Sequence, residues 1–206
     1  MLRILLILLL LCSGTVNAGA QTILLVGDSL SAAYGMPADA GWVALLQRRL
    51  ESEQYPYQLV NASISGDTSA SARARLPDAL DRHRPDIVIL QIGGNDGLRG
   101  LSLTELKQNL ADMIERVTVR GSRCLLPGVH LPPNYGSHYT GKFHTLFHEL
   151  AGATGAALVP SLVDGIGTRS DFMQPDGIHP NREAQPVIAG RVWTKLQPML
   201  KSLTAP

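Results

Sequence analysis

Five short runs of aliphatic residues alternate along the chain with longer segments that have helical periodicity. Most of the runs are continuously apolar, which is typical of strands buried on both faces of a parallel sheet. Helices between successive strands supply the crossover connections that parallel pairing needs. We therefore expect an α/β fold, a three-layer α/β/α sandwich with a five-stranded parallel sheet. The predicted strands are 22–26, 58–62, 86–91, 123–126 and 157–159, and the predicted helices are 42–53, 69–82, 103–119, 142–153 and 184–203.

Two segments depart from this regular pattern. Pro77 falls inside the predicted helix 69–82, where its missing backbone N–H predicts a kink or a restart. Residues 127–141 form one long stretch that is expected to be irregular. Long loops in compact domains are usually functional or mobile, so this stretch is a candidate wall of a binding site.

The first 18 residues have the layout of a secretory signal peptide. Arg3 gives a short basic start, residues 4–11 are continuously aliphatic, and Val16 and Ala18 occupy the small-residue positions before a cleavage site. The apolar run is shorter than the roughly 20 residues that a membrane-spanning helix needs, so no stable membrane insertion is expected.

The predicted mature protein is a single domain of residues 19–206, located in the periplasm or secreted after removal of residues 1–18. Two alternatives remain open at this end of the chain. The leader could be cut after Ala20, and Cys12 could carry a lipid anchor, although Leu11 stands where a small residue would precede a lipidated cysteine.

The charge balance argues against a nucleic-acid partner. The chain has 18 Lys and Arg against 17 Asp and Glu, and the leader holds one basic residue, Arg3, and no acidic one. The remaining chain is therefore formally neutral and has no basic cluster to neutralise several phosphates. Cys124 is the single cysteine beyond the leader, so no internal disulfide is predicted, and its aliphatic neighbours indicate a buried strand position.

Chemically useful residues follow three of the predicted strands. Ligands of parallel α/β sheets bind outside the carboxyl ends of the strands, so the residues just after each strand are candidate site residues. Ser29 follows the first strand, Gly66 the second and Asn95 the third. Each also has a simpler interpretation as a turn or helix-capping residue, which is preferred for Ser29 and Gly66 when each is taken alone.

Asp176 and His179 lie three residues apart near the C-terminus, in a turn that contains Gly177 and Pro180. A serine nucleophile needs a histidine as general base, and that histidine needs an acceptor on its other ring nitrogen. An Asp–His pair together with a distant serine would meet that need. The alternative is that His179 is an ordinary surface turn residue.

His144 and His148 share a helical face at a spacing that is compatible with a metal. Thr145 stands where the helix of a zinc protease has a glutamate, and no third ligand is evident. We therefore predict no metal at this pair. The glycines at 94, 97 and 100 lack the lysine and the spacing of a phosphate loop, so no nucleotide cofactor is predicted.

Four blocks taken together resemble one family. Gly27-Asp28-Ser29-Leu30, Gly66, Gly93-Gly94-Asn95-Asp96 and Asp176-Gly177-Ile178-His179-Pro180 occur in the order and at the separations of the SGNH hydrolases, also called the GDSL family. More narrowly, residues 61–68, 93–100 and 131–136 are similar to the branch of bacterial periplasmic arylesterases, acyl-CoA thioesterase I and lysophospholipases. That resemblance implies a flavodoxin-like, single-domain fold and activity without a metal or cofactor.

The resemblance also implies roles for individual residues. Ser29 is expected to be the nucleophile, His179 the general base and acid, and Asp176 the residue that orients His179. The backbone N–H groups of Ser29 and Gly66 and the side-chain amide of Asn95 are expected to form the oxyanion hole. No G-x-S-x-G motif is present, so the α/β-hydrolase family is disfavoured.

The expected activity is hydrolysis of acyl esters and thioesters through an acyl-enzyme intermediate, by a monomer acting on a small-molecule substrate. In the loop 127–141, Leu131, Pro132 and Tyr135 offer apolar surface for an acyl chain. A carbohydrate acetyl esterase of the same family and a secreted, non-catalytic binding protein are the alternatives.

Overall fold

The computed structural model describes residues 21–204, so the predicted leader and Cys12 lie outside the described residues. Five strands pair in parallel in the order β2-β1-β3-β4-β5. The expectation of a five-stranded parallel sheet is confirmed. The strands are β1 (Gln21–Gly27), β2 (Tyr57–Asn61), β3 (Ile87–Gln91), β4 (Arg123–Pro127) and β5 (Ala157–Val159).

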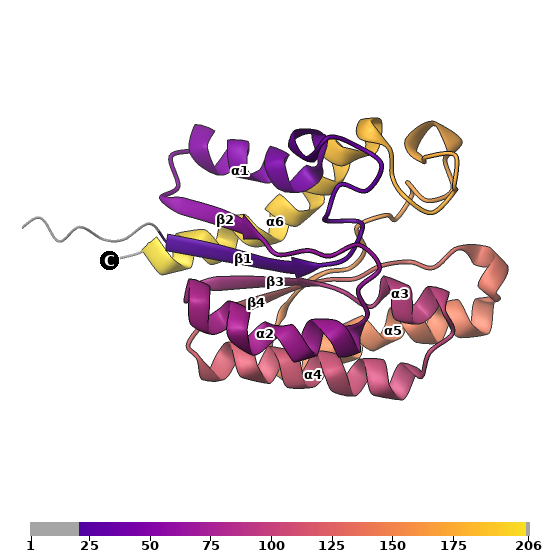
Figure 1. The fold of residues 1–206 in the computed structure, drawn as a ribbon, viewed down its shortest axis with the longest axis horizontal. Helices are drawn as coiled ribbons and strands as arrows, with labels where there is room; N and C mark the ends of the chain where they lie inside the picture. The colour runs from indigo at the N-terminus through magenta and orange to yellow at the C-terminus, as the bar shows by residue number, and fades with distance from the viewer. Residues whose placement is uncertain (1–20, 205–206) are drawn as a thin grey trace, which may run out of the picture.

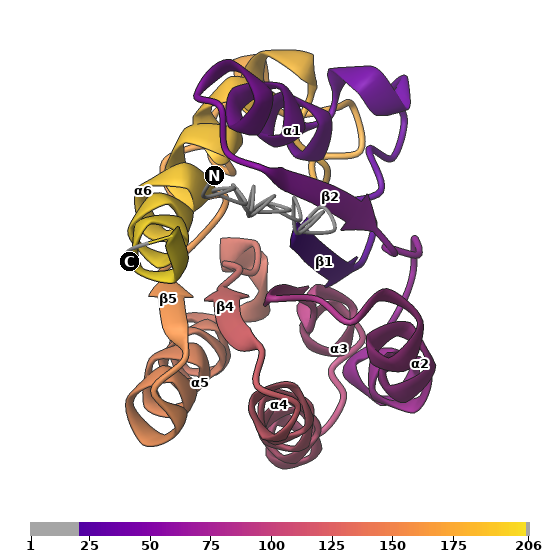
Figure 2. The same ribbon diagram turned by 90° about the vertical axis from the view of Figure 1, so that its left-hand side faces the viewer.

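Helices cover both faces of the sheet and complete the three layers (Figure 1). Figure 2 shows two helices on one face, α1 (Trp42–Ser52) and α6 (Gln185–Thr204). The opposite face carries α2 (Ser69–His83), α4 (Leu103–Val119) and α5 (Ser137–Thr154), which pack side by side. Among the described residues, no helix is both long enough and apolar enough to cross a membrane.

The central strands are covered on both faces, as their continuously apolar sequences predict. All five residues of β3 are buried, and Ile23 to Val26 of β1 have no exposed surface. Cys124 lies buried within β4, as expected from its neighbours. In α4 the buried residues recur at helical spacing on the side that faces the sheet: Leu106, Leu110, Met113, Ile114 and Val117.

The structure differs from the sequence expectations in the second half of the predicted loop 127–141. A short 3₁₀ helix covers Pro133–Tyr135, and α5 begins at Ser137, five residues before the predicted start. Gly136, with φ at +81°, turns the chain into the helix, and Thr140 bonds back to its carbonyl. The helix α2 also continues through Pro77 without the expected restart. A further helix, α3 (Gly94–Leu98), replaces the turn suggested by its glycines.

The strand order places the chemistry between β1 and β3. The chain leaves β1 toward β2 on one side and later returns to β3 on the other, so the order reverses at β1. A crevice forms at such a reversal, outside the carboxyl ends of the two strands. Gly27 and Gln91, the last residues of β1 and β3, are paired in register. Ser29 and Asn95 follow these two strand ends and therefore face the same crevice.

Candidate active site

Ser29 is presented on a tight turn at the end of β1. The backbone N–H groups of Ser31 and Ala32 both donate to the carbonyl of Asp28, and Tyr34 N–H donates to that of Ser29. Gly27 permits the close packing beneath this turn, because a Cβ there would lie 2.8 Å from Ser63 Oγ. The Ser29 side chain is left half-buried, with its hydroxyl toward the crevice.

The structure brings Asp176 and His179 together and places them beside Ser29. His179 Nδ1 lies 2.6 Å from Asp176 Oδ2, and His179 Nε2 lies 2.9 Å from Ser29 Oγ. With Nδ1–H donated to the carboxylate, Nε2 carries a lone pair and accepts the serine O–H. The ring of Tyr34 stacks on His179 at 4.4 Å between centroids, which holds the imidazole plane.

The turn that carries His179 is built around the carboxylate of Asp176. Asp176 Oδ1 accepts the backbone N–H groups of Ile178 at 2.9 Å and of His179 at 3.0 Å. Partial burial raises the pKa of Asp176, but the hydrogen bonds from the backbone and ring of His179 and from the Ile178 N–H outweigh it and lower the pKa to about 2. Asp176 is thus a carboxylate at any pH near neutrality and a constant acceptor for the ring.

Three hydrogen-bond donors are available for an oxyanion, although they differ in position. No acceptor in the described part of the chain takes the backbone N–H of Ser29 or of Gly66. The Asn95 amide uses one N–H on the carbonyl of Asp67 at 2.9 Å, which leaves its second N–H free. Ser29 and Asn95 line the cavity described below, whereas Gly66 lies outside that lining, on an exposed turn with φ at +83°.

The turn that contains Gly66 is held by the segment that carries Asn95. In addition to the Asn95 bond to Asp67, Arg99 Nη2 donates to the carbonyl of Gly66 at 3.0 Å. Behind the turn, Asp67 pairs with Arg75 at 2.7 Å. These contacts fix the two loops that follow β2 and β3 relative to each other.

Asp28, the neighbour of Ser29, is a buried carboxyl group. Its Oδ1 accepts the Leu30 backbone N–H at 3.0 Å and the Gln91 side-chain amide at 3.1 Å. Gln91 in turn accepts the hydroxyl of Ser31. Burial raises the pKa of Asp28 to about 6, against the lowering effect of these two hydrogen bonds.

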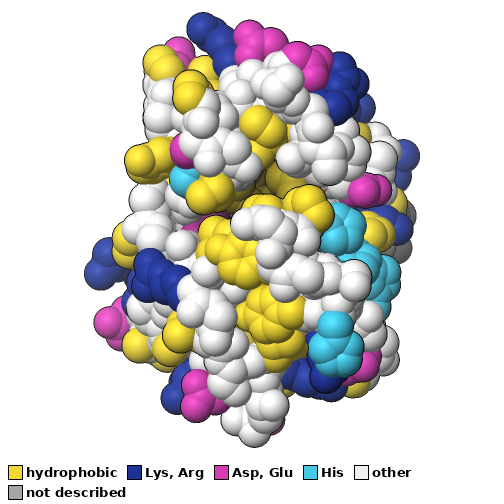
Figure 3. Space-filling model, turned by 90° about the vertical axis from the view of Figure 1, so that its right-hand side faces the viewer, with side chains coloured by type: hydrophobic (Ala, Val, Ile, Leu, Met, Phe, Trp, Pro, Cys, Tyr) yellow, Lys and Arg dark blue, Asp and Glu magenta, His cyan; other side chains and the backbone are white. Residues whose placement is uncertain are grey.

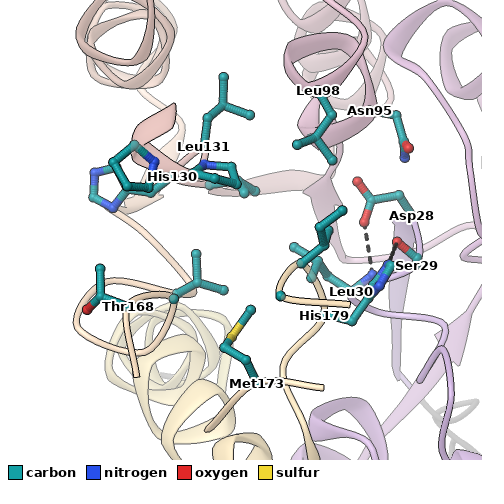
Figure 4. Close-up of a pocket in the computed structure, with 18 residues that line it drawn as sticks. Asp28, Ser29, Leu30, Asn95, Leu98, His130, Leu131, Thr168, Met173 and His179 are labelled. Atoms are coloured by element: carbon teal, nitrogen blue, oxygen red, sulfur yellow. Dashed lines mark hydrogen bonds between the residues drawn. The ribbon is translucent and has the colours of Figure 1, made fainter. Parts of the chain in front are cut away.

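An apolar cavity of about 240 Å³ opens beside Ser29 (Figure 3). In Figure 4 it runs from Ser29 and His179 at one end to His130 and Thr168 at the other. Its hydrophobic lining comes mainly from α3 and from the loops that follow β4 and β5: Leu98, Val129, Leu131, Pro132, Pro133, Val163 and Met173. Leu131 and Pro132 thus lie in the cavity wall, but Tyr135 does not. The Tyr135 hydroxyl donates instead to the carbonyl of Leu98 at 3.0 Å.

Comparison with known proteins agrees with this geometry. The model of the GDSL-like lipase/acylhydrolase family matches residues 25–185. The chain belongs to this family. It is 50% identical to esterase TesA of Pseudomonas aeruginosa over 186 residues, which cover 90% of this chain and 92% of the relative. It is 43% identical to thioesterase 1/protease 1/lysophospholipase L1 of Escherichia coli K12 over 183 residues, covering 89% of this chain and 86% of the relative.

A solved structure shows that this member of the GDSL-like family shares its fold with a relative. The crystal structure of a protein named TesA superposes with a TM-score of 0.86 at 49% sequence identity. The match covers 87% of this chain and 99% of that one. The SGNH-type resemblance and the predicted class of hydrolase acting on ester bonds are therefore confirmed.

Three histidines that follow β4 form a cluster of contacting rings beside the cavity and are not part of the family's four blocks. His130 lines the cavity and contacts the ring of His144 at 4.1 Å between centroids, and His144 contacts His148 at 4.9 Å. Burial, together with the two neighbouring imidazoles, lowers the pKa of His144. No group of three or more metal-ligating side chains with suitable geometry occurs within residues 21–204.

Several residues of this hydrolase site were not predicted from the sequence. Gln91 had a visible signal, since it is a polar residue at the end of an otherwise aliphatic strand. Val163 and Met173 had none, because single apolar residues in an irregular segment look the same whether they face a cavity or the core. The hydrogen bond from Arg99 to Gly66 joins residues 33 positions apart and leaves no local pattern either.

Proposed function

We propose that this protein hydrolyses esters and thioesters of medium-chain acyl groups, with Ser29 as nucleophile, His179 as general base and acid, and Asp176 as the residue that orients His179. The observation that carries the proposal is the continuous arrangement of Asp176, His179 and Ser29, with separations of 2.6 and 2.9 Å, at the mouth of an apolar cavity.

The reaction follows from the proton positions in this arrangement. Ser29 Oγ attacks the acyl carbon while its proton passes to His179 Nε2. When the tetrahedral intermediate collapses, the imidazolium gives that proton to the departing alcohol or thiol, and the acyl group remains on Ser29. A water molecule then attacks the acyl-enzyme as His179 takes its proton, and the free acid leaves when that proton returns to Ser29.

The negative charge on the carbonyl oxygen requires fixed donors in the transition state. We assign this role to the Ser29 N–H, the Gly66 N–H and the second N–H of Asn95, none of which has a partner in the described residues. Donors that are already held in place cost little reorganisation when the charge develops, which is why they are effective. Asp67 and Arg99 support this assignment by fixing the Gly66 turn against Asn95.

The cavity favours an acyl chain over a sugar as the group that is bound. Its walls are mainly apolar, and about 240 Å³ is far more room than an acetyl group fills. The names of the relatives, an esterase and a thioesterase/lysophospholipase, point to the same substrate classes. We further propose that the mature protein is exported, on the basis of the leader predicted at residues 1–18.

The decisive experiment removes only the nucleophilic hydroxyl. Ser29→Ala should abolish hydrolysis of p-nitrophenyl esters and labelling by a fluorophosphonate probe, because no other group can carry the acyl intermediate. Ser52→Ala, an exposed serine on α1, is the matched control and should retain both. Esterase activity that persists in pure Ser29→Ala protein would overturn the assignment, and a wild-type protein that the probe does not label would favour the binding-protein alternative.

A further inference from the structure

The two sides of Ser29 differ in chemical character because of the strand order. The sheet runs β2-β1-β3-β4-β5, so the loops after β4 and β5 lie on one side of Ser29 and the loop after β2 lies on the other. The apolar cavity is lined by residues after β1, β3, β4 and β5, and by none from the loop after β2. When an acyl chain occupies the cavity, the alcohol or thiol half of the substrate therefore lies on the β2 side of Ser29.

Arg99 presents a cation on that second side. It follows Leu98, a cavity residue, and its backbone N–H caps α3 by donating to the carbonyl of Asn95. Its side chain turns away from the cavity, since Nη2 reaches the Gly66 carbonyl at 3.0 Å. The guanidinium is thus fixed next to a proposed oxyanion-hole residue by one of its five N–H groups, which leaves the others free.

The charge of Arg99 has no counter-ion in the part of the chain that the structure describes. Within residues 21–204, no carboxylate lies within ion-pair distance of it, and the side chain is exposed. Arg75, in the same region, shows the contrast, because it pairs with Asp67 at 2.7 Å and also donates to the carbonyl of Ala62. The nearby carboxylate of Asp96 is also occupied, since it accepts the backbone N–H and hydroxyl of Ser69.

We propose that Arg99 binds a phosphate on the leaving group of the ester or thioester and so selects substrates whose leaving group is anionic. The proposal rests on the proposed function, because it assumes that the acyl chain enters the cavity and that Ser29 attacks. A guanidinium presents several donors in one plane and suits phosphate oxygens, with which it forms charge-assisted hydrogen bonds. The hydrogen bond to Gly66 already orients the guanidinium group, so less side-chain entropy is lost when phosphate binds.

Two leaving groups contain such a phosphate, glycerol phosphate of a lysophospholipid and coenzyme A. In glycerol phosphate the anion is only a few bonds from the ester oxygen, whereas in coenzyme A the pantetheine arm separates it from the sulfur. Two pairs of substrates distinguish them. The first pair is 1-dodecanoyl-glycerol 3-phosphate and 1-dodecanoyl-glycerol; the second is dodecanoyl-CoA and dodecanoyl-N-acetylcysteamine.

The measurement is the ratio of kcat/KM for the phosphate substrate to kcat/KM for its neutral partner, in the wild type and in Arg99→Gln. A ratio is independent of the fraction of active protein and cancels any effect of the substitution on the Gly66 turn. We expect the ratio to fall about tenfold in Arg99→Gln, mainly through KM, as for loss of a hydrogen bond to a charged group. Arg99→Lys should retain part of the preference, because an ammonium still binds phosphate as a point charge.

Arg48→Gln is the matched control, because Arg48 is also exposed and also donates Nη2 to a backbone carbonyl, that of Asp39 at 3.1 Å. It should leave both ratios as in the wild type, and added salt should weaken the wild-type preference by screening. A fall in the first ratio alone identifies a lysophospholipid, and a fall in the second alone identifies coenzyme A. Unchanged ratios in Arg99→Gln, or an equal fall in Arg48→Gln, would refute the role of Arg99. Failure of the proposed function would appear separately, as neutral-ester hydrolysis that does not depend on Ser29.

Discussion

Replacing Asp28 by Asn should change how the stability of the protein depends on pH. Asp28 is 1% exposed, and burial raises its pKa from 3.8 to about 6. A raised folded-state pKa means that the folded protein binds a proton more tightly than the unfolded chain does. The contribution of Asp28 to stability is therefore fully present below about pH 4 and is lost as the pH rises through about 6.

The magnitude follows from the size of that rise. At about 1.4 kcal/mol for each pKa unit, the change from 3.8 to about 6 corresponds to about 3 kcal/mol of stability lost by pH 7. Asn keeps the Oδ1 acceptor for Leu30 N–H and for the Gln91 amide, so both hydrogen bonds can survive. The Asn side chain does not ionise, so the pH-dependent loss is absent from the variant.

The assay is urea unfolding of the wild type and Asp28→Asn at several pH values between 4 and 8. The difference in free energy of unfolding, variant minus wild type, should grow by up to about 3 kcal/mol between pH 4 and pH 7 and then level off. Asp78→Asn, an exposed carboxylate on α2, is the control and should show no comparable growth.

Two results would refute the reasoning. A difference that stays flat from pH 4 to pH 8 would mean that the folded protein does not hold the proton on Asp28. A difference that shrinks with rising pH would mean that the charged carboxylate is stabilised in the fold. Asp176 does not interfere, because its lowered pKa of about 2 places its own loss of stability at more acid pH and in both proteins alike.

Two further predictions concern catalysis. Asn95→Ala should lower kcat by about 10² to 10³ with little change in KM, because a donor to the oxyanion acts mainly in the transition state; a large rise in KM at constant kcat would make Asn95 a substrate-binding residue instead. Leu131→Ala should flatten the increase of kcat/KM from acetyl to dodecanoyl p-nitrophenyl esters, because each methylene buried against this wall is worth about 0.8 kcal/mol. Leu101→Ala, at an exposed leucine that does not line the cavity, should leave the chain-length series unchanged, and a series in which acetyl is the best substrate would favour an acetyl esterase.

The sequence by itself determined the central strands of the sheet, because strands buried on both faces are continuously apolar and such runs can be recognised individually. It also determined which residues follow each strand, and hence that Ser29 and Asn95 lie at the edge where ligands bind. The pairing of Asp176 with His179 could also be predicted from the sequence, because its geometry depends on a turn of only four residues.

Local patterns failed where glycines occur near helix ends. The segment Gly94–Leu98 contains two glycines, which left a plain turn as one interpretation, yet it forms α3, and Asp96 anchors it to Ser69 at the start of α2. The start of α5 was placed five residues too late, since Gly136 at its N-cap and the polar residues after it resemble a loop.

Only the tertiary structure decided the chemistry between distant residues. Ser29 and His179 are 150 positions apart, and their 2.9 Å contact exists because the last loop returns to the carboxyl end of β1. The raised pKa of Asp28 depends on burial by the whole fold, and the apolar cavity depends on side chains contributed by several separate loops. Likewise, the exposed charge of Arg99 has meaning only because a hydrogen bond to Gly66 holds its guanidinium against the loop after β2, on the side of Ser29 away from that cavity. Local sequence encodes local geometry, whereas burial, electrostatics and the shape of a cavity are sums over residues that meet only after folding.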